Sequence, residues 1–347
     1  MSRFAAFDLV PVDEGKQTAK DFKSDQEVRW CPGCGDYAIL AAFQSFLPEL
    51  GLRRENMVIV SGIGCSSRFP YYLNTYGMHS IHGRAPAIAT GLACSRPDLS
   101  VWVMTGDGDG LSIGGNHLVH ALRRNVNLRI LLFNNRIYGL TKGQYSPTSE
   151  LGKVTKSTPF GSLDAPFNPL SLALGAEASF VARTVDSDRK HLIEVLRQAS
   201  EHKGAAFVEI LQNCPIYNDD AFEPLKDPAS RDDSTIRLQH GERIVFGANR
   251  DKGLRRDPTT GALEICPADD PAVLVHDATR PDPTTAFALS RLDDGSLSNV
   301  PIGVFRSVER PTYDGLMRDQ IADATRAQGE GDLQELLTAG DTWRVDA

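Results

Sequence analysis

The 347-residue sequence lacks the features that mark a membrane-spanning or a nucleic-acid-binding protein. It has no run of about 18 or more apolar residues, so we expect no transmembrane helix. The 37 Lys and Arg residues are outnumbered by 45 Asp and Glu residues, and the net charge of −8 argues against a nucleic-acid-binding surface. Residues 1–24 contain no apolar stretch followed by a cleavage site. We therefore expect a cytoplasmic protein without a signal peptide and without a membrane or nucleic-acid partner.

Cysteine is also scarce, with six residues in the chain. Because cytoplasmic thiols stay reduced, we expect these residues to be metal ligands or core residues rather than disulfides. Cys31 and Cys34 form a C-x-x-C in the stretch RWCPGCGDYAIL (29–40). This spacing fits a redox disulfide, half of a zinc site or half of an iron–sulfur site, so the motif alone does not decide between them.

The order of the apolar segments indicates the fold. Short, nearly continuous apolar runs predict buried strands at 57–65, 100–110, 127–135 and 205–214. Segments with helical spacing occur at 37–50, 85–96, 114–125 and 186–204. Strands that alternate with helices and are nearly all apolar predict an α/β fold, with a parallel sheet covered by helices on both faces.

The pattern changes towards both ends of the chain. Residues 1–24 are polar and aperiodic and are interpreted as an N-terminal arm, which precedes a main domain at 25–235. From 236 to 347 Pro, Asp and Arg become frequent, although helical spacing returns at 284–292 and 313–327. We interpret this last part as a C-terminal extension that wraps the main domain or a partner.

Chemically capable residues stand at the ends of the predicted strands. In parallel sheets covered on both faces, ligands bind beyond the carboxyl ends of the strands. Here those ends carry Cys65, Asp107, Asn135 and Cys214. We therefore expect the functional site at this edge of the sheet.

Two of these residues belong to the motifs GDGDG (106–110) and NN (134–135). One strand–helix–strand unit separates the motifs, which places Asp107 and Asn135 at adjacent strand ends. A carboxylate and an amide oxygen form a partial shell for Mg²⁺, which takes its remaining ligands from phosphates and water. The glycines let backbone N–H groups approach a phosphate. A tight turn with Asp107 as a helix cap is the alternative.

The spacing from GDG to NN resembles the thiamine diphosphate motif. The segments GIGCSSR (62–68), HGRAPAIATG (82–91) and NNRIYGLTKGQYSPTS (134–149) resemble the β subunit of 2-oxoacid:ferredoxin oxidoreductases, most closely the 2-oxoglutarate type. The resemblance covers residues 25–220 and implies a thiamine diphosphate-binding fold, with 25–235 as the diphosphate-binding half and the iron–sulfur domain. It implies that Asp107, Asn135 and the backbone carbonyl of Ile137 hold Mg²⁺. The residues that it assigns to the cofactor are Ile63, Gly64, Cys65, Ser66, His82, Gly106, Asp107, Gly108, Asp109, Asn135, Ile137, Gly139, Leu140 and Thr141.

The same resemblance gives four cysteines a role. It implies that Cys31, Cys34, Cys65 and Cys214 bind a [4Fe–4S] cluster, for which thiolates are the usual ligands. A structural zinc ion and unrelated core thiols are the alternatives. Cys266 competes for the fourth position, and Cys214 is preferred because it closes a predicted strand at the ligand edge.

The resemblance also implies an activity. The chain would be the β subunit of a 2-oxoglutarate:ferredoxin oxidoreductase, which converts 2-oxoglutarate and coenzyme A to succinyl-CoA and CO₂ and reduces ferredoxin. A larger α subunit would supply the Glu that activates thiamine and much of the substrate site, in an α2β2 assembly. One rival interpretation is an enzyme for pyruvate or another 2-oxoacid. The other is a metal-stabilised electron-carrier subunit that has lost thiamine chemistry.

Four residues have implied catalytic roles: Arg68, His82, Leu140 and Thr141. Arg68 is the candidate for the distal carboxylate of 2-oxoglutarate, because a guanidinium holds a carboxylate through two parallel hydrogen bonds. In the related enzymes a basic residue at this position is associated with the larger substrate, and pyruvate enzymes carry a polar Asn where this chain has Leu140. Pairing of Arg68 with a nearby acid or with the partner subunit is the alternative.

Overall fold

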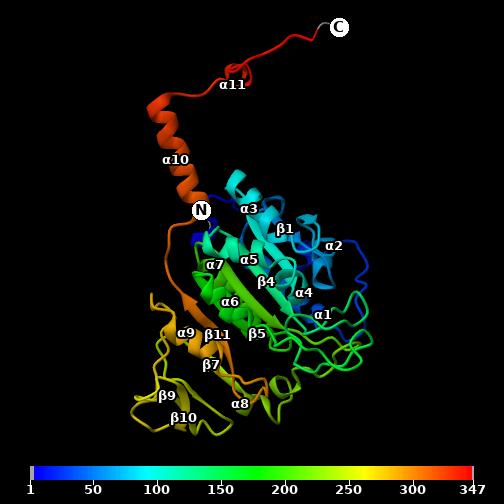
Figure 1. Cartoon of the computed structure of the whole chain (residues 1–347), viewed down its shortest axis with the longest axis vertical. Coiled ribbons are helices and arrows are strands. Elements are labelled where there is room, and N and C mark those ends of the chain that lie inside the picture. Colours follow the sequence, from blue (N-terminus) through cyan, green and yellow to red (C-terminus); the bar gives the residue numbers. More distant parts are fainter. Residues whose placement is uncertain (1–3, 346–347) are drawn as a thin grey trace.

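The computed structural model of the chain describes residues 4–345. At its centre lies an eight-stranded sheet with the strand order β2-β1-β3-β4-β6-β5-β11-β7 (Figure 1). Its strands are β1 Met57–Ser61, β2 Tyr76–His79, β3 Ser100–Gly106, β4 Arg129–Asn134, β5 Phe180–Val185, β6 Ala206–Leu211, β7 Thr235–Leu238 and β11 Val300–Ser307. Neighbouring strands run parallel except for β5 and β11, which are antiparallel. The carboxyl ends of β1, β3, β4 and β6 therefore share one edge.

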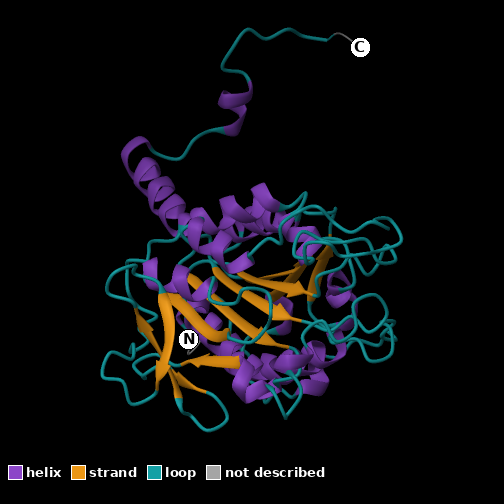
Figure 2. Cartoon of the chain, turned by 60° about the horizontal axis from the view of Figure 1, so that its bottom comes forward, coloured by secondary structure: helices purple, strands orange, loops and turns teal. Residues whose placement is uncertain are grey.

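Helices cover both faces of this sheet, as Figure 2 shows. The helices within residues 4–345 are α1 Asp36–Leu50, α2 Phe69–Tyr72, α3 Ala85–Ser95, α4 Asp107–Leu111, α5 Gly115–Arg123, α6 Pro169–Gly175, α7 Arg189–Glu201, α8 Arg231–Ser234, α9 Thr284–Ser290, α10 Tyr313–Gln328 and α11 Leu333–Leu337. One face packs against α1 and α7, with Phe43, Trp102 and Phe133 in the shared core. The other face packs against α3, α5, α6 and α9. Because both faces are covered, the central strands are almost wholly apolar.

Local sequence signals set the ends of the long helices. The side chain of Asp188 accepts a hydrogen bond from the backbone N–H of His191 and caps α7. Helix α1 ends at Gly51, whose φ of 62° lies in the left-handed region that glycine enters easily. The helices expected at 37–50, 85–96, 114–125 and 186–204 correspond to α1, α3, α5 and α7.

The predicted α/β class is confirmed, with four predicted strands matching β1, β3, β4 and β6. The sequence did not indicate β2, β5, β7 or β11, so the sheet is wider than expected. Within residues 4–345, no helix is both long enough and apolar enough to cross a membrane.

Both outer parts of the chain take part in the fold. Phe4, Phe7 and Phe22 of the expected arm are buried in the core beneath α1 and α7. In the C-terminal part, β7 and β11 join the main sheet, while β8 Val245–Phe246, β9 Lys252–Arg256 and β10 Leu263–Pro267 form a separate antiparallel sheet. Helix α10 projects from the body (Figure 1). The division into 1–24, 25–235 and 236–347 stays a prediction, and its second boundary falls inside β7.

Candidate functional site

A cavity of about 430 Å³ opens at the carboxyl ends of β1, β3 and β4. Its walls come mainly from the loops that follow these strands, as expected for a parallel sheet. Every residue that the resemblance assigned to the cofactor lines it: Ile63, Gly64, Cys65, Ser66, His82, Gly106, Asp107, Gly108, Asp109, Asn135, Ile137, Gly139, Leu140 and Thr141. Gln144 also lines the cavity, as do Phe133 and Tyr138, which the sequence did not indicate.

Two glycines are required where these loops approach one another. A Cβ atom on Gly108 would lie 2.2 Å from the ring of Tyr138, and one on Gly62 would lie 2.0 Å from the carboxylate of Asp109. Any side chain at either position would collide with its neighbour. The glycines of the GIG and GDG segments thus allow the close packing of the loops that line the cavity.

Asp107 is the first residue of α4 and is 2% exposed. Its Oδ2 atom accepts hydrogen bonds from Ser146 Oγ at 2.5 Å and from Thr148 Oγ1 at 2.6 Å. Burial raises the pKa of Asp107 to about 6, because the charged form loses its contact with water. A cation beside this carboxylate would compensate for the lost hydration, so Asp107 fits the role of a magnesium ligand.

Asn135 and Ile137 line the same cavity as Asp107. The Oδ1 atom of Asn135 accepts a hydrogen bond from the Ile137 N–H at 3.2 Å, and its Nδ2 donates to Gln212 Oε1 at 2.8 Å. Carboxylate, amide and carbonyl oxygens are the donors that Mg²⁺ prefers. Among residues 4–345, no group of three or more His, Cys, Asp or Glu is placed to hold a metal ion. The magnesium set contains a single carboxylate, so that finding does not bear on it.

His82 and Asp109 form a hydrogen-bonded pair in the cavity wall. Nδ1 of His82 lies 2.6 Å from Oδ1 of Asp109, which is 2% exposed. The same carboxylate accepts hydrogen bonds from the N–H groups of Gly83 and Ile63 and from the hydroxyl of Thr105. Asp109 therefore ties together the loops after β1, β2 and β3 and fixes the direction in which the imidazole faces the cavity.

The four cysteines assigned to a cluster are neighbours of one another, and Cys65 lines the cavity. The thiols of Cys65 and Cys214 both lie against Gly139. Burial, together with the nearby Asp36, Cys214 and Cys31, raises the pKa of Cys65 to about 12. Burial, Asp36 and Cys65 likewise raise the pKa of Cys34. Thiols with raised pKa values stay protonated unless a metal supplies positive charge, so these neighbouring thiols are compatible with a cluster, although no three of them within residues 4–345 are placed as a metal site.

Cys266 lies elsewhere in the fold. It is on β10, where it pairs with Gly253 of β9, and its charged neighbours include Asp270 and Arg255. The structure therefore brings Cys214, and not Cys266, beside Cys65.

Of the residues with implied catalytic roles, three line the cavity and one does not. His82, Leu140 and Thr141 are part of the wall, and Leu140 is 46% exposed. Arg68 stands outside it, at the end of the turn that begins after Cys65, and its Nη1 donates to the backbone carbonyl of Arg29 at 3.5 Å. The catalytic roles of all four stay predictions.

The cavity lies within a segment that matches a known protein family. Residues 62–210 match the family model described as thiamine pyrophosphate enzyme, C-terminal TPP binding domain. The chain is 64% identical over 342 residues to the 2-oxoglutarate oxidoreductase subunit KorB of Mycobacterium tuberculosis, a match that covers 97% of this chain and 91% of that one. It is 48% identical over 192 residues to the 2-oxoacid:ferredoxin oxidoreductase subunit beta of Saccharolobus solfataricus, covering 55% of this chain and 63% of that protein.

A solved structure also matches. It is the 2-oxoglutarate:ferredoxin oxidoreductase from Magnetococcus marinus with 2-oxoglutarate, coenzyme A and succinyl-CoA bound. The TM-score is 0.75 at 33% sequence identity, over 96% of this chain and 100% of that chain. The likeness therefore extends over the C-terminal part as well as the cavity.

Proposed function

Because this chain belongs to the family of 2-oxoacid:ferredoxin oxidoreductase β subunits, we propose that it is the β subunit of an enzyme that oxidatively decarboxylates 2-oxoglutarate with coenzyme A to succinyl-CoA and CO₂. The observation that supports this most directly is the cavity at the strand ends, which is lined by every residue expected to contact the cofactor. The names of the relatives support the choice of 2-oxoglutarate.

The residues of this chain would bind and orient the cofactors. Asp107, Asn135 and the carbonyl of Ile137 would hold Mg²⁺ against the diphosphate, and the other wall residues would orient thiamine diphosphate. The chemistry that thiamine diphosphate supplies when bound is the stabilisation of negative charge on the substrate carbon during decarboxylation. His82, held by Asp109, would present its second ring nitrogen to the cavity.

Cys31, Cys34, Cys65 and Cys214 would hold a [4Fe–4S] cluster, whose chemistry is the transfer of single electrons. Cys65 belongs both to the cofactor wall and to the cysteine group, so the two sites share a wall. Cys31 is exposed, and this side of the group is where a ferredoxin would take up electrons. Reduced thiols at such a site fit the cytoplasm.

The name β subunit implies a second chain. We propose that a larger α subunit contributes the Glu that activates thiamine together with much of the substrate site, and that the enzyme is an α2β2 assembly. Enzymes of this kind that use pyruvate or another 2-oxoacid are the closest alternative. A subunit without thiamine chemistry is less well supported, because residues 62–210 match a thiamine pyrophosphate-binding domain and Asp107, Asn135 and Ile137 line one cavity.

The test uses the complex of this chain with its α subunit, purified without oxygen. Incubation with 2-oxoglutarate and coenzyme A should reduce ferredoxin and form succinyl-CoA, which mass spectrometry identifies. Pyruvate should be a much poorer substrate. Faster turnover of pyruvate would replace the substrate and leave the reaction class intact, whereas absence of thiamine diphosphate binding would refute the proposed function.

A further inference from the structure

Asn134 and Asn135 follow one another at the end of β4, yet their side chains belong to different cavities. Asn135 lines the cofactor cavity, whereas Asn134 lines a second cavity of about 320 Å³. Successive side chains of a strand point to opposite faces of the sheet, which explains this division. The second cavity is also lined by Thr148, Arg183 and Glu209.

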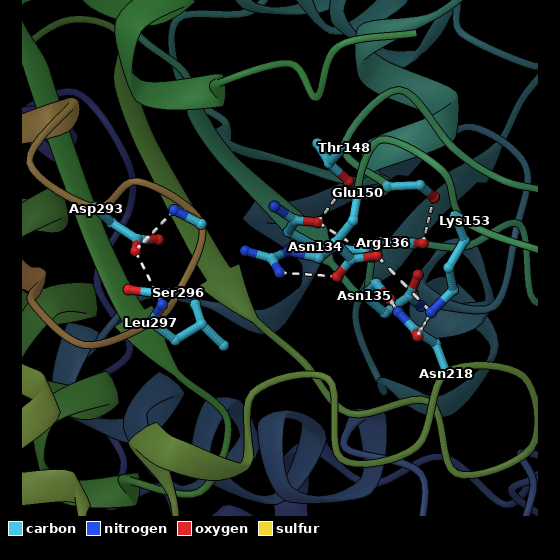
Figure 3. Close-up of polar contacts among 12 residues, drawn as sticks. Asn134, Asn135, Arg136, Thr148, Glu150, Lys153, Asn218, Asp293, Ser296 and Leu297 are labelled. Atoms are coloured by element: carbon cyan, nitrogen blue, oxygen red, sulfur yellow. Dashed lines mark hydrogen bonds and ion pairs between the residues drawn. The ribbon is translucent and has the colours of Figure 1, made fainter. Parts of the chain in front are cut away.

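A series of close polar contacts runs from this second cavity to Asp107. Thr148 Oγ1 lies 2.6 Å from Asp107 Oδ2 and 2.8 Å from Asn134 Oδ1, the second contact being visible in Figure 3. Nδ2 of Asn134 donates to Glu209 Oε1 at 2.7 Å, and Nε of Arg183 donates to Glu209 Oε2 at 2.7 Å. None of the five side chains belongs to a residue more than 7% exposed, so water competes little with these bonds.

The register of β4, β5 and β6 brings Asn134, Glu209 and Arg183 next to one another. Arg183 of β5 is the direct partner of Glu209 on β6. Asn134 of β4 pairs with Leu211, two residues beyond Glu209, so Asn134 and Glu209 lie diagonally on one face. A buried ion pair adds little net stability, because desolvation offsets most of its attraction. The ion pair also orients Asn134, because Glu209 accepts hydrogen bonds from both Arg183 and Asn134.

The hydrogen-bonding capacity of each group gives the series a direction. A carboxylate accepts and does not donate, so Glu209 turns the amide nitrogen of Asn134 towards itself and the amide oxygen towards Thr148. The backbone N–H of Arg136 donates to the same oxygen at 3.2 Å and supports this orientation. Thr148 has a single hydroxyl proton, for which Asn134 and Asp107 compete.

We propose that Glu209 is a positioning residue for the metal site: through Asn134 and Thr148 it holds the carboxylate of Asp107 in the orientation that binds the divalent cation. The inference rests on the proposed function, because it takes Asp107 as a metal ligand. The charged carboxylate of Asp107 is a stronger acceptor than the amide oxygen of Asn134, so it keeps the proton of Thr148, while the N–H of Arg136 satisfies the Asn134 oxygen. The series therefore fixes the hydroxyl of Thr148 between Asn134 and Asp107, where it donates to the carboxylate.

The test measures the binding of Mn²⁺, a paramagnetic substitute for Mg²⁺, by electron paramagnetic resonance. It uses the α–β complex stripped of its own cation and supplied with thiamine diphosphate. Thr148→Val removes the hydroxyl with little change of shape, and Glu209→Gln removes the charge. Each variant should weaken Mn²⁺ binding about tenfold, the effect of losing a hydrogen bond to a charged group.

Two control variants define the expected specificity. Thr148→Ser keeps the hydroxyl and should bind Mn²⁺ within about twofold of the wild type. Glu264→Gln breaks the cross-strand pair with Arg255 in the small sheet, far along the chain from the site, and should leave Mn²⁺ binding unchanged.

Each outcome decides something. Thr148→Val does not touch the ion pair, so it tests the series even where Glu209→Gln fails to fold. Unchanged Mn²⁺ affinity in Thr148→Val overturns the inference, and so does a Glu209→Gln variant that melts earlier but binds Mn²⁺ normally. Asp107→Ala distinguishes a failure of the inferred series from a failure of the proposed metal site. If it loses Mn²⁺ while Thr148→Val keeps it, the series is wrong and the metal site stands; if it keeps Mn²⁺, the proposed metal site is wrong.

Discussion

The thiols of Cys65 and Cys214 face the same point of the backbone. A Cβ atom on Gly139 would lie 3.7 Å from Sγ of Cys65 and 3.5 Å from Sγ of Cys214. The cysteines follow β1 and β6, which are separated in the sheet by β3 and β4, so the loops and not the strands bring them together. Gly139 also lines the cofactor cavity, which leaves a short path between that cavity and the thiols.

The first prediction is that these thiols bind iron. Protein purified without oxygen should be brown and contain about four iron atoms per chain, the count for a [4Fe–4S] centre held by four cysteines. Cys214→Ala should lose iron, because it removes one of the ligands. Cys266→Ala, on the separate sheet, is the matched control and should retain it. Stoichiometric zinc without iron would contradict this assignment.

The second prediction concerns Asp107. Asp107→Ala should abolish binding of thiamine diphosphate while the chain still folds, because only neutral ligands would remain for the cation beside the diphosphate. Titration calorimetry measures the affinity, and circular dichroism checks the fold. Asp164→Ala removes an exposed carboxylate from the loop between β4 and α6 and should bind the cofactor normally. Equal affinity in the two variants would speak against a role for Asp107 in metal binding.

The third prediction is that the chain without its α subunit has no turnover. The cavity wall described here contains no Glu, and thiamine enzymes of this kind need a Glu to activate the aminopyrimidine ring. Adding the α subunit should restore activity. Turnover by rigorously purified β chain, shown free of α subunit by mass spectrometry, would prove this expectation wrong.

The fold was predictable where strands are buried on both faces. Such strands are nearly continuous apolar runs, as in β3 and β4. Strand β2 has four residues, Tyr76–His79, and all are exposed, so no apolar run marks it. Strand β11 contains Pro301 and Gly303, which usually interrupt strands, and β5 contains Arg183, which is accommodated by Glu209.

The site was predictable where it depends on strand ends and family motifs. The loop between 135 and 148 folds back in a way that no local pattern indicates. As a result, the hydroxyls of Ser146 and Thr148 reach Asp107, and Tyr138 packs on Gly108. Residue type identified the chemically capable groups, but the tertiary course of the loop decides which of them meet.

The fourth prediction is a loss of stability in mild acid. His202 is 8% exposed, and burial together with the nearby Arg129 lowers its pKa from 6.5 to about 3. Since the folded pKa lies below the unfolded one, the stabilisation is complete above pH 6.5 and is lost as the pH falls towards 3. The free energy of unfolding should drop by about 1–2 kcal/mol between pH 7 and pH 5 through this group.

Urea unfolding at the two pH values measures this effect. His202→Gln cannot take up the proton and should show a smaller decrease than the wild type. His240→Gln, at an exposed position, should behave like the wild type. A decrease as large in His202→Gln as in the wild type would assign the acid sensitivity to other groups.

The fifth prediction is that Arg68 sets the preference for 2-oxoglutarate. Its guanidinium makes a 3.5 Å hydrogen bond to the carbonyl of Arg29, and a bond of that length is weak enough for a substrate carboxylate to compete. Arg68→Met should reduce kcat/KM for 2-oxoglutarate by about 2–4 kcal/mol of transition-state stabilisation, because the distal carboxylate loses its charged partner. Steady-state kinetics on the reconstituted α–β complex measure this change.

A short 2-oxoacid without the distal carboxylate provides the internal control. Its kcat/KM should change far less in Arg68→Met, since it never uses the guanidinium. Arg29→Met removes a neighbouring side chain that is 72% exposed, and it should leave both substrates unaffected. The position of Arg68 outside the cavity wall makes the comparison informative. If Arg68→Met slows both substrates equally, Arg68 supports the loop that carries Cys65 and does not select the substrate.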